Sequence, residues 1–295
     1  MAALAATLMF ALPSVAMAAL LSAVLAHSPG MTMRIGGLGR GLLAISSVAI
    51  AAFSLSYAHL EWQSLPAWLP WREAWVYGWA VILLGASAGL CFPRLALPGV
   101  LTIGVYHFVA AAIAVPLIVA EPLSIGAWYP FCEPATALAA AWLLYSVLRL
   151  ESPEPETPLV GAGTVQAAKV LFALTCIFYG LSHFVYADYT ASLVPAWLPG
   201  RLAFAYLTGI GHVAAGVAII VGILPGVAAI LEAIMMSLFG LLVWVPSFFM
   251  QPRPAWAVPP EKQWSELVAT LSLAASAWII AICLRKIRRD PTNRR

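Results

Sequence analysis

Long apolar runs separated by short polar or Pro-rich segments dominate this chain. Each run is long enough, at about 1.5 Å per helical residue, to cross or nearly cross about 30 Å of hydrocarbon. The runs cover residues 2–26, 41–60, 74–93, 97–120, 131–148, 168–187, 202–223, 226–249 and 267–284. We therefore predict nine membrane-crossing helices. Proline disfavours helix at and before its own position, so loops are predicted at FPRLALPG (92–99), ILPG (223–226) and PSFFMQPRPAWAVPP (246–260).

An unusual segment occurs twice, as YAHLEWQSLPAWLPWREAWVY (57–77) and as YADYTASLVPAWLPGRLAFAY (186–206). Ten of the 21 aligned positions are identical, where unrelated segments would share about one or two. Both copies contain PAWLP and are followed by an apolar run. The repetition indicates an internal duplication.

Grouping the runs by this repeat places four helices in each half. We predict an extra N-terminal transmembrane helix in 1–30 and a first four-helix repeat in 31–150. A linker containing SPEPETP follows in 151–166, and a second four-helix repeat with a basic tail in 167–295. The fold class is therefore an all-α integral membrane protein with two parallel-oriented repeats.

The basic residues predict the orientation. With four helices per repeat, both halves enter the membrane from the same side, so an axis along the membrane normal should relate them. Eleven of the 15 Lys and Arg residues then fall on one side, including the tail RKIRRDPTNRR, and four on the other. Because positive residues favour the cytoplasmic side, we expect a multi-pass protein of the bacterial cytoplasmic (inner) membrane with its C-terminus in the cytoplasm.

Composition indicates a lipid bilayer as the surroundings of the chain and argues against nucleic acid as a partner. The chain is 63% hydrophobic and 9% charged, with a mean hydropathy of +0.93, whereas soluble domains carry about 25% charge. The basic residues sit at the ends of apolar runs, so a nucleic-acid partner is excluded. No basic residues precede the first run, which favours an extra helix over a signal peptide; a natural start at Met31 or Met33 is the alternative.

Ionisable groups inside the bilayer are costly and are therefore candidate functional residues. Four are predicted there: His107, His183, His212 and Glu232. Three of the four lie in the second half, which should carry any chemistry. Three further groups at loop edges are expected to be solvated: His59, Glu61 and Asp188.

Counting helix rise places His212 and Glu232 at similar depth on neighbouring antiparallel helices. We predict that they face each other, with His183 above them toward the outer surface, and that the three form a polar ladder. The pair is either a structural hydrogen bond, a proton- or quinone-facing catalytic site, or a metal or haem site. The same count separates His183 from His212 by about 10 Å in depth, which disfavours paired haem ligation. No metal motif is present, so we predict no metal site; the cofactor is unknown, with quinone a candidate.

Three motifs in the second half resemble those of the DoxX-like family of four-helix membrane proteins. They are GLSHF (180–184), VPAWLP (194–199) and YLTGIGHVAAG (206–216). The first half resembles the family more weakly, so the chain looks like a tandem of two DoxX-like units. The family usually has an acidic residue where this chain has His212. The resemblance implies a link to quinone-linked redox systems, mostly as an accessory subunit.

Three function classes follow. The first is an accessory or structural subunit of a membrane redox complex, with other subunits of that complex as partners. The second is a quinone- or proton-handling membrane oxidoreductase whose site lies in the second repeat. The third is a small-molecule transporter, although the sequence lacks the broken helices and multiple charged groups typical of many transporters.

Overall fold

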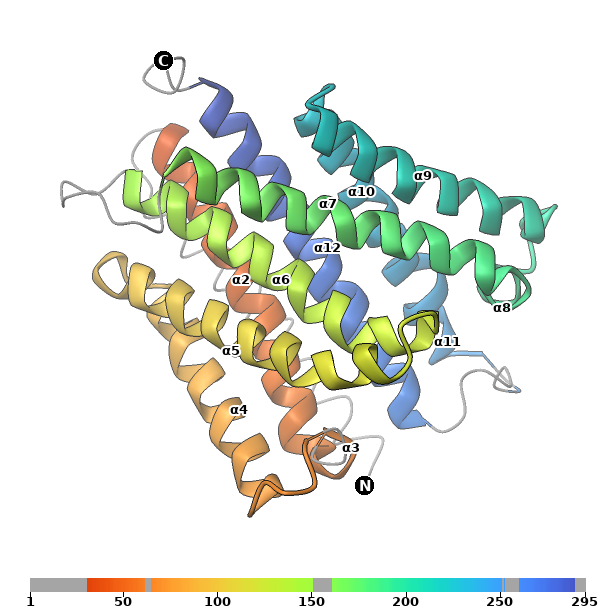
Figure 1. The fold of residues 1–295 in the computed structure, drawn as a ribbon, viewed down its shortest axis with the longest axis horizontal. Helices are drawn as coiled ribbons and strands as arrows, with labels where there is room; N and C mark the ends of the chain where they lie inside the picture. The colour runs from red at the N-terminus through yellow and green to blue at the C-terminus, as the bar shows by residue number, and fades with distance from the viewer. Residues whose placement is uncertain (1–30, 62–64, 151–160, 251, 253–259, 290–295) are drawn as a thin grey trace.

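The computed structural model describes residues 31–61, 65–150, 161–250, 252 and 260–289, and within this part the regular structure is entirely helical (Figure 1). Eight long helices are joined by shorter ones. They are α2 (Met31–Ser56), α3 (Ala58–Glu61), α4 (Arg72–Gly89), α5 (Pro93–Ala120), α6 (Ile125–Leu150), α7 (Ala162–Val185), α8 (Ala187–Leu193), α9 (Arg201–Val221), α10 (Pro225–Phe239), the π-helix η2 (Gly240–Trp244), α11 (Val245–Ser247) and α12 (Pro260–Arg289).

Seven helical segments in this part of the chain are long and apolar enough to cross a membrane, which confirms an all-α membrane protein. The eighth long helix, α4, has 18 residues and carries Arg72 and Glu73 in its first turn. It is not among the seven. The predicted helix in residues 1–30 lies outside the described residues.

Several helices extend beyond the apolar runs that predicted them. The segment 92–99 is not a loop as predicted, because α5 begins at Pro93 and contains Pro98. Proline is compatible with the first helical position, whose N–H has no helical acceptor. Helix α6 likewise begins at Ile125 and continues through two prolines. Helix α7 begins at Ala162, inside the segment predicted as linker. Apolar runs mark the part of a helix within hydrocarbon, and polar turns continue beyond it.

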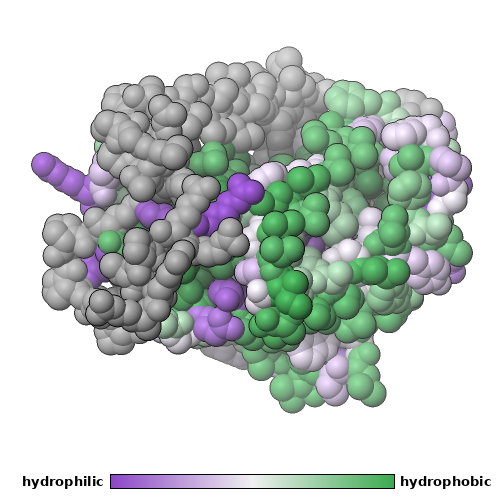
Figure 2. Space-filling view, turned by 90° about the horizontal axis from the view of Figure 1, so that it is seen from above, coloured by the Kyte–Doolittle hydropathy of each residue, from purple (hydrophilic) through white to green (hydrophobic). Residues whose placement is uncertain are grey.

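The outer surface of the bundle is apolar. Figure 2 shows large areas of hydrophobic side chains among the coloured residues of the face seen from above, with polar side chains between them. Exposed side chains include Leu101, Leu207 and Leu241 on three different helices. The two PAWLP tryptophans, Trp68 and Trp197, are 80% and 71% exposed. Such a surface is stable against lipid, with tryptophan favoured at the level of the headgroups.

The two halves cross the bundle in the same direction. Helices α2 and α7 both begin at the upper left of Figure 1, and α6 and α12 both end there. We call the other end, which carries α3, α8 and both PAWLP loops, the PAWLP end. This arrangement agrees with four helices per repeat.

The duplication extends to backbone geometry. In each PAWLP loop the Leu N–H donates to the first Pro carbonyl at 3.0 Å, Leu69 to Pro66 and Leu198 to Pro195. The residue before the following helix, α4 or α9, has a left-handed backbone conformation in both copies: Trp71 with φ 51° and Gly200 with φ 68°. A left-handed conformation is strained for tryptophan and unstrained for glycine. Both copies thus use the same turn, although only one has the residue that favours it.

Packing between the halves is reciprocal. The first helix of each half packs against the last helix of the other, α2 on α12 and α7 on α6, and α6 packs on α12. Small side chains make this possible: Ala137, Ala139, Ala140 and Ala141 of α6 are all buried. In lipid, close approach of helices through small residues is a main source of association energy. Helices α6 and α12 therefore form the centre of the molecule.

Candidate functional site

The predicted pair of buried ionisable side chains is present in the second half. His212 of α9 and Glu232 of α10 are 1% and 3% exposed, and His212 Nδ1 lies 2.7 Å from Glu232 Oε1. This is the distance of a charge-assisted hydrogen bond. The second oxygen, Oε2, has no hydrogen-bond partner of normal geometry among the described residues, while the weak donor Cys176 interacts with the carboxyl group.

A seam of glycines brings α7 and α9 together around this pair. A Cβ added at Gly180 would lie 2.6 Å from the Gly209 carbonyl oxygen, and one at Gly216 would lie 2.5 Å from the Ala173 carbonyl oxygen. Neither position tolerates a side chain without parting the helices. Since His183 and His212 each follow a seam glycine by three residues, the close crossing places both histidines at the same contact.

The rings of His183 and His212 are 5.0 Å apart, centre to centre, in an edge-to-face arrangement. The expectation that about 10 Å of depth separates them is therefore wrong for the side chains. Side chains on a helix lean toward its N-terminus. Because α7 and α9 are antiparallel, the two imidazoles lean toward each other. Phe239 of α10 packs against both rings and closes the site on a third side.

Hydrogen bonds determine the tautomer of His183. Its Nδ1 lies 2.9 Å from Thr208 Oγ1 and 3.3 Å from the Ala205 carbonyl oxygen. Thr208 donates its own proton to the backbone of α9. The tautomer with hydrogen on Nδ1 satisfies both contacts, because a carbonyl oxygen only accepts. This leaves Nε2 of His183 as a proton acceptor next to His212.

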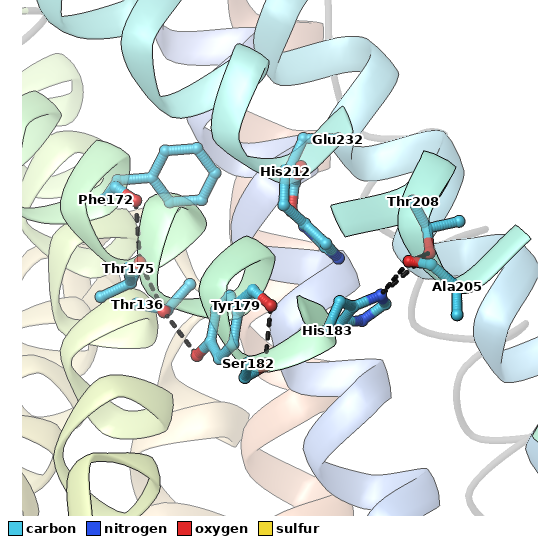
Figure 3. A network of polar contacts seen from close by, with 10 residues as sticks. All are labelled: Thr136, Phe172, Thr175, Tyr179, Ser182, His183, Ala205, Thr208, His212 and Glu232. Carbon is cyan, nitrogen blue, oxygen red and sulfur yellow. Dashed lines mark hydrogen bonds and ion pairs between the residues drawn. The ribbon is translucent and has the colours of Figure 1, made fainter. Parts of the chain in front are cut away.

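A chain of hydroxyl groups joins the two halves beside this site (Figure 3). Thr136 Oγ1 of α6 lies 3.1 Å from Tyr179 OH and 2.9 Å from Thr175 Oγ1, both on α7. Thr175 donates to the Phe172 carbonyl oxygen. The Tyr179 ring is 6.1 Å from that of His212, centre to centre. The ladder is thus flanked by a polar contact between the halves that the sequence did not predict.

The structure also contains a cavity of about 650 Å³, and it lies in the first half rather than beside the ladder. His107, one of the four predicted residues, lines it and is 3% exposed. Glu133 lines it as well. Sequence reasoning missed Glu133 as a site residue because it is near the start of the predicted run 131–148. The sequence signal was present, since a carboxyl group within a predicted membrane helix is a candidate by the same rule as Glu232.

The remaining predicted groups lie apart from both sites. His59 and Asp188 are exposed, as expected for loop edges. The side chain of Glu61 lies outside the described residues. In the part of the chain that the structure describes, no group of three or more His, Cys, Asp or Glu residues could hold a metal ion.

Comparison with known proteins adds no relative: no family model, no curated protein and no solved structure matches this chain.

Proposed function

We propose that this chain is a DoxX-like subunit of a quinone-linked redox complex in the bacterial inner membrane and that its second half handles protons. The buried hydrogen bond between His212 and Glu232, with the His183 ring against it, carries this proposal. A carboxyl group inside a bilayer is costly and is by default functional. The resemblance of the second-half motifs to the DoxX-like family supports the redox context.

The geometry suits the transfer of single protons. A proton moving along the 2.7 Å bond converts the ion pair of His212 and Glu232 into a neutral pair. Alternatively, a protonated His212 gives its Nε2 proton to Nε2 of His183 and keeps its Nδ1–H on Glu232, so that the proton moves from one imidazole to the other. Two imidazolium ions with ring centres 5.0 Å apart would repel strongly in an apolar interior. The ladder therefore holds one additional proton at a time.

The alternative is that the pair only holds α9 to α10, so that the chain is an accessory scaffold of the complex. The glycine seam between α7 and α9 favours this alternative, because it closes the surroundings of the pair tightly. Membrane hydrogen bonds of this kind contribute about 1 kcal/mol. A transporter, the third class, requires a binding cavity, and the cavity of about 650 Å³ is lined by none of the ladder residues.

Glutamine at position 232 separates the two roles. In membranes of cells that lack the gene, quinol oxidation with decylubiquinol is measured after complementation with wild type, Glu232→Gln or His212→Ala. We expect Glu232→Gln to insert normally and to lose most of the rate, because an amide accepts the His212 hydrogen bond and does not exchange a proton. Full activity of Glu232→Gln would favour the scaffold. Equal rates with and without the gene would refute the quinone-linked role.

Orientation is tested separately. A cysteine tag after Arg295 should react with a membrane-impermeant reagent only after the cytoplasmic face is opened. Labelling from the periplasmic side would overturn the proposed topology.

A further inference from the structure

The cavity in the first half has the size of a small-molecule site. Its volume of about 650 Å³ falls within the range of ligand pockets, about 300–1,000 Å³. It lies between α2, α4, α5, α6 and the part of α12 nearest the PAWLP end. Its wall is mostly apolar, as expected for a ligand with an apolar body.

The cavity occupies the position that corresponds, through the duplication, to the His183 site. Three of its lining residues, Ser54, Val76 and Trp79, align with His183 and its two partners, Ala205 and Thr208, at the spacing of the PAWLP repeat. Ser54 is much smaller than histidine and bonds to the backbone of its own helix. The first half thus contains open space where the second half contains an imidazole.

Two polar groups in the wall have no protein partner that satisfies them. Nδ1 of His107 is buried and has no hydrogen-bond partner in the described structure. Glu133 receives no hydrogen bond from any described residue, and the residue is partly buried in the cavity wall. Buried polar groups in native proteins are normally paired. An imidazole nitrogen and a carboxyl group without partners, from residues of one cavity wall, therefore indicate a missing polar partner.

Apart from His107 and Tyr106, the ionisable groups at the cavity are carboxyl groups. Glu266 of α12 is close enough to interact electrostatically with Glu133. No Lys or Arg lines the cavity within the described ranges, and the nearby Lys262 is exposed and interacts with Glu266. The rings of Trp79 and Tyr106 also line the space, 5.7 Å apart. Aromatic faces attract cations.

We propose that this cavity binds a lipophilic amine in its protonated form. One ammonium N–H donates to the Glu133 carboxylate and a second to Nδ1 of His107, while the apolar body packs on residues such as Phe53 and Ile113. A quinone, by contrast, carries carbonyl oxygens that only accept hydrogen bonds, so it cannot donate to Glu133 and His107 as an ammonium group does. This inference is independent of the proton ladder, since it involves none of the ladder residues.

Two dansyl probes with the same body test the proposal on the purified full-length protein. Dansylcadaverine has a primary amine that is protonated at pH 7, and its N-acetyl derivative is neutral. We expect dansyl fluorescence to rise on binding of the amine, and the acetylated probe to bind at least about tenfold more weakly, the loss expected for one charge-assisted hydrogen bond. Equal affinity of the wild-type protein for the two probes would overturn the proposal, and no substituted protein is needed for this test.

Variants then locate the binding. Glu133→Gln and His107→Ala should each weaken dansylcadaverine binding, Glu133→Gln by about tenfold or more. Ala110→Leu, which places a larger side chain in the cavity wall, should also reduce binding. Glu121→Gln is the matched control, because it removes the same charge at an exposed position just after α5. Binding that is unchanged in both Glu133→Gln and Ala110→Leu, or displacement by decylubiquinone that Glu133→Gln does not affect, would refute an amine site here.

Discussion

The second half of the molecule closes around polar side chains, whereas at the corresponding place of the first half an open-sided cavity lies between its helices and the start of α12. Both halves have four helices running in the same order and direction and share the same PAWLP turn. His183 in one half aligns with Ser54 in the other, and buried His212 aligns with buried Leu83. The same scaffold therefore supports a filled polar site in one half and an open site in the other.

The difference begins at the crossing of the first two long helices in each half. At the spacing of the repeat, the seam residues Gly180, Gly209 and Gly216 align with Ala51, Ala80 and Ser87. Each of these first-half residues has side-chain atoms at the position where a glycine lets α7 and α9 meet through their backbones. A duplicated helix pair can thus change from a closed to an open site by small substitutions.

The largest effect is expected from breaking the seam. Gly180→Ala should lower the free energy of unfolding by about 1–3 kcal/mol, the range for overpacking, since the new methyl group meets the Gly209 carbonyl. Thermal unfolding in detergent measures it. The matched control is Gly85→Ala on α4, where an added Cβ meets nothing within 4 Å. Equal stability of the two variants would show that the seam does not hold α7 to α9.

Replacing His212 by the residue found at the aligned position of the first half tests the pair of His212 and Glu232. His212→Leu introduces the residue found at the aligned position and leaves Glu232 without its partner. We expect a loss of about 1–2 kcal/mol, as for membrane hydrogen bonds. Adding Glu232→Val should recover part of this loss, because no polar group then remains unpaired. A double variant less stable than His212→Leu would contradict the pairing, and denaturation followed by tryptophan fluorescence distinguishes the two results.

Removing the hydroxyl chain tests the contact between the halves. Thr136→Val keeps the shape of the side chain and deprives Tyr179 of its hydrogen-bond partner. The expected cost is about 0.5–1 kcal/mol. Thr102→Val is the control, since Thr102 is only partly buried and bonds to its own helix. An equal loss of unfolding free energy in both variants would mean that the hydroxyl groups do not stabilise the contact between α6 and α7.

Filling the cavity is expected to have the smallest effect and the opposite sign. Ala110→Leu should raise the free energy of unfolding by about 0.5 kcal/mol, because cavity filling commonly stabilises proteins. The melting temperature should rise slightly as a result. Ala139→Leu, at a position that is fully buried in α6, is the contrasting variant and should destabilise by overpacking. Destabilisation by Ala110→Leu as large as that by Ala139→Leu would indicate that the space around residue 110 is closed in solution.

The sequence by itself determined the membrane class, the place of each described long helix and the common direction of the two halves. These properties depend on local hydrophobicity and on the number of crossings, both of which can be counted along the chain. The pairing of His212 with Glu232 was also predictable, because few ionisable groups lie within the apolar runs and two of them share a depth.

Only the tertiary structure decided how side chains from different helices meet. His183 and His212 come together because antiparallel helices lean their side chains toward each other across a glycine contact, which depth along each helix does not reveal. Glu133 belongs to a cavity because α6 begins at Ile125, about 12 Å before it, and continues through two prolines. Helix ends, crossing distances and empty space depend on contacts between distant segments, so they appear only when the whole bundle is assembled.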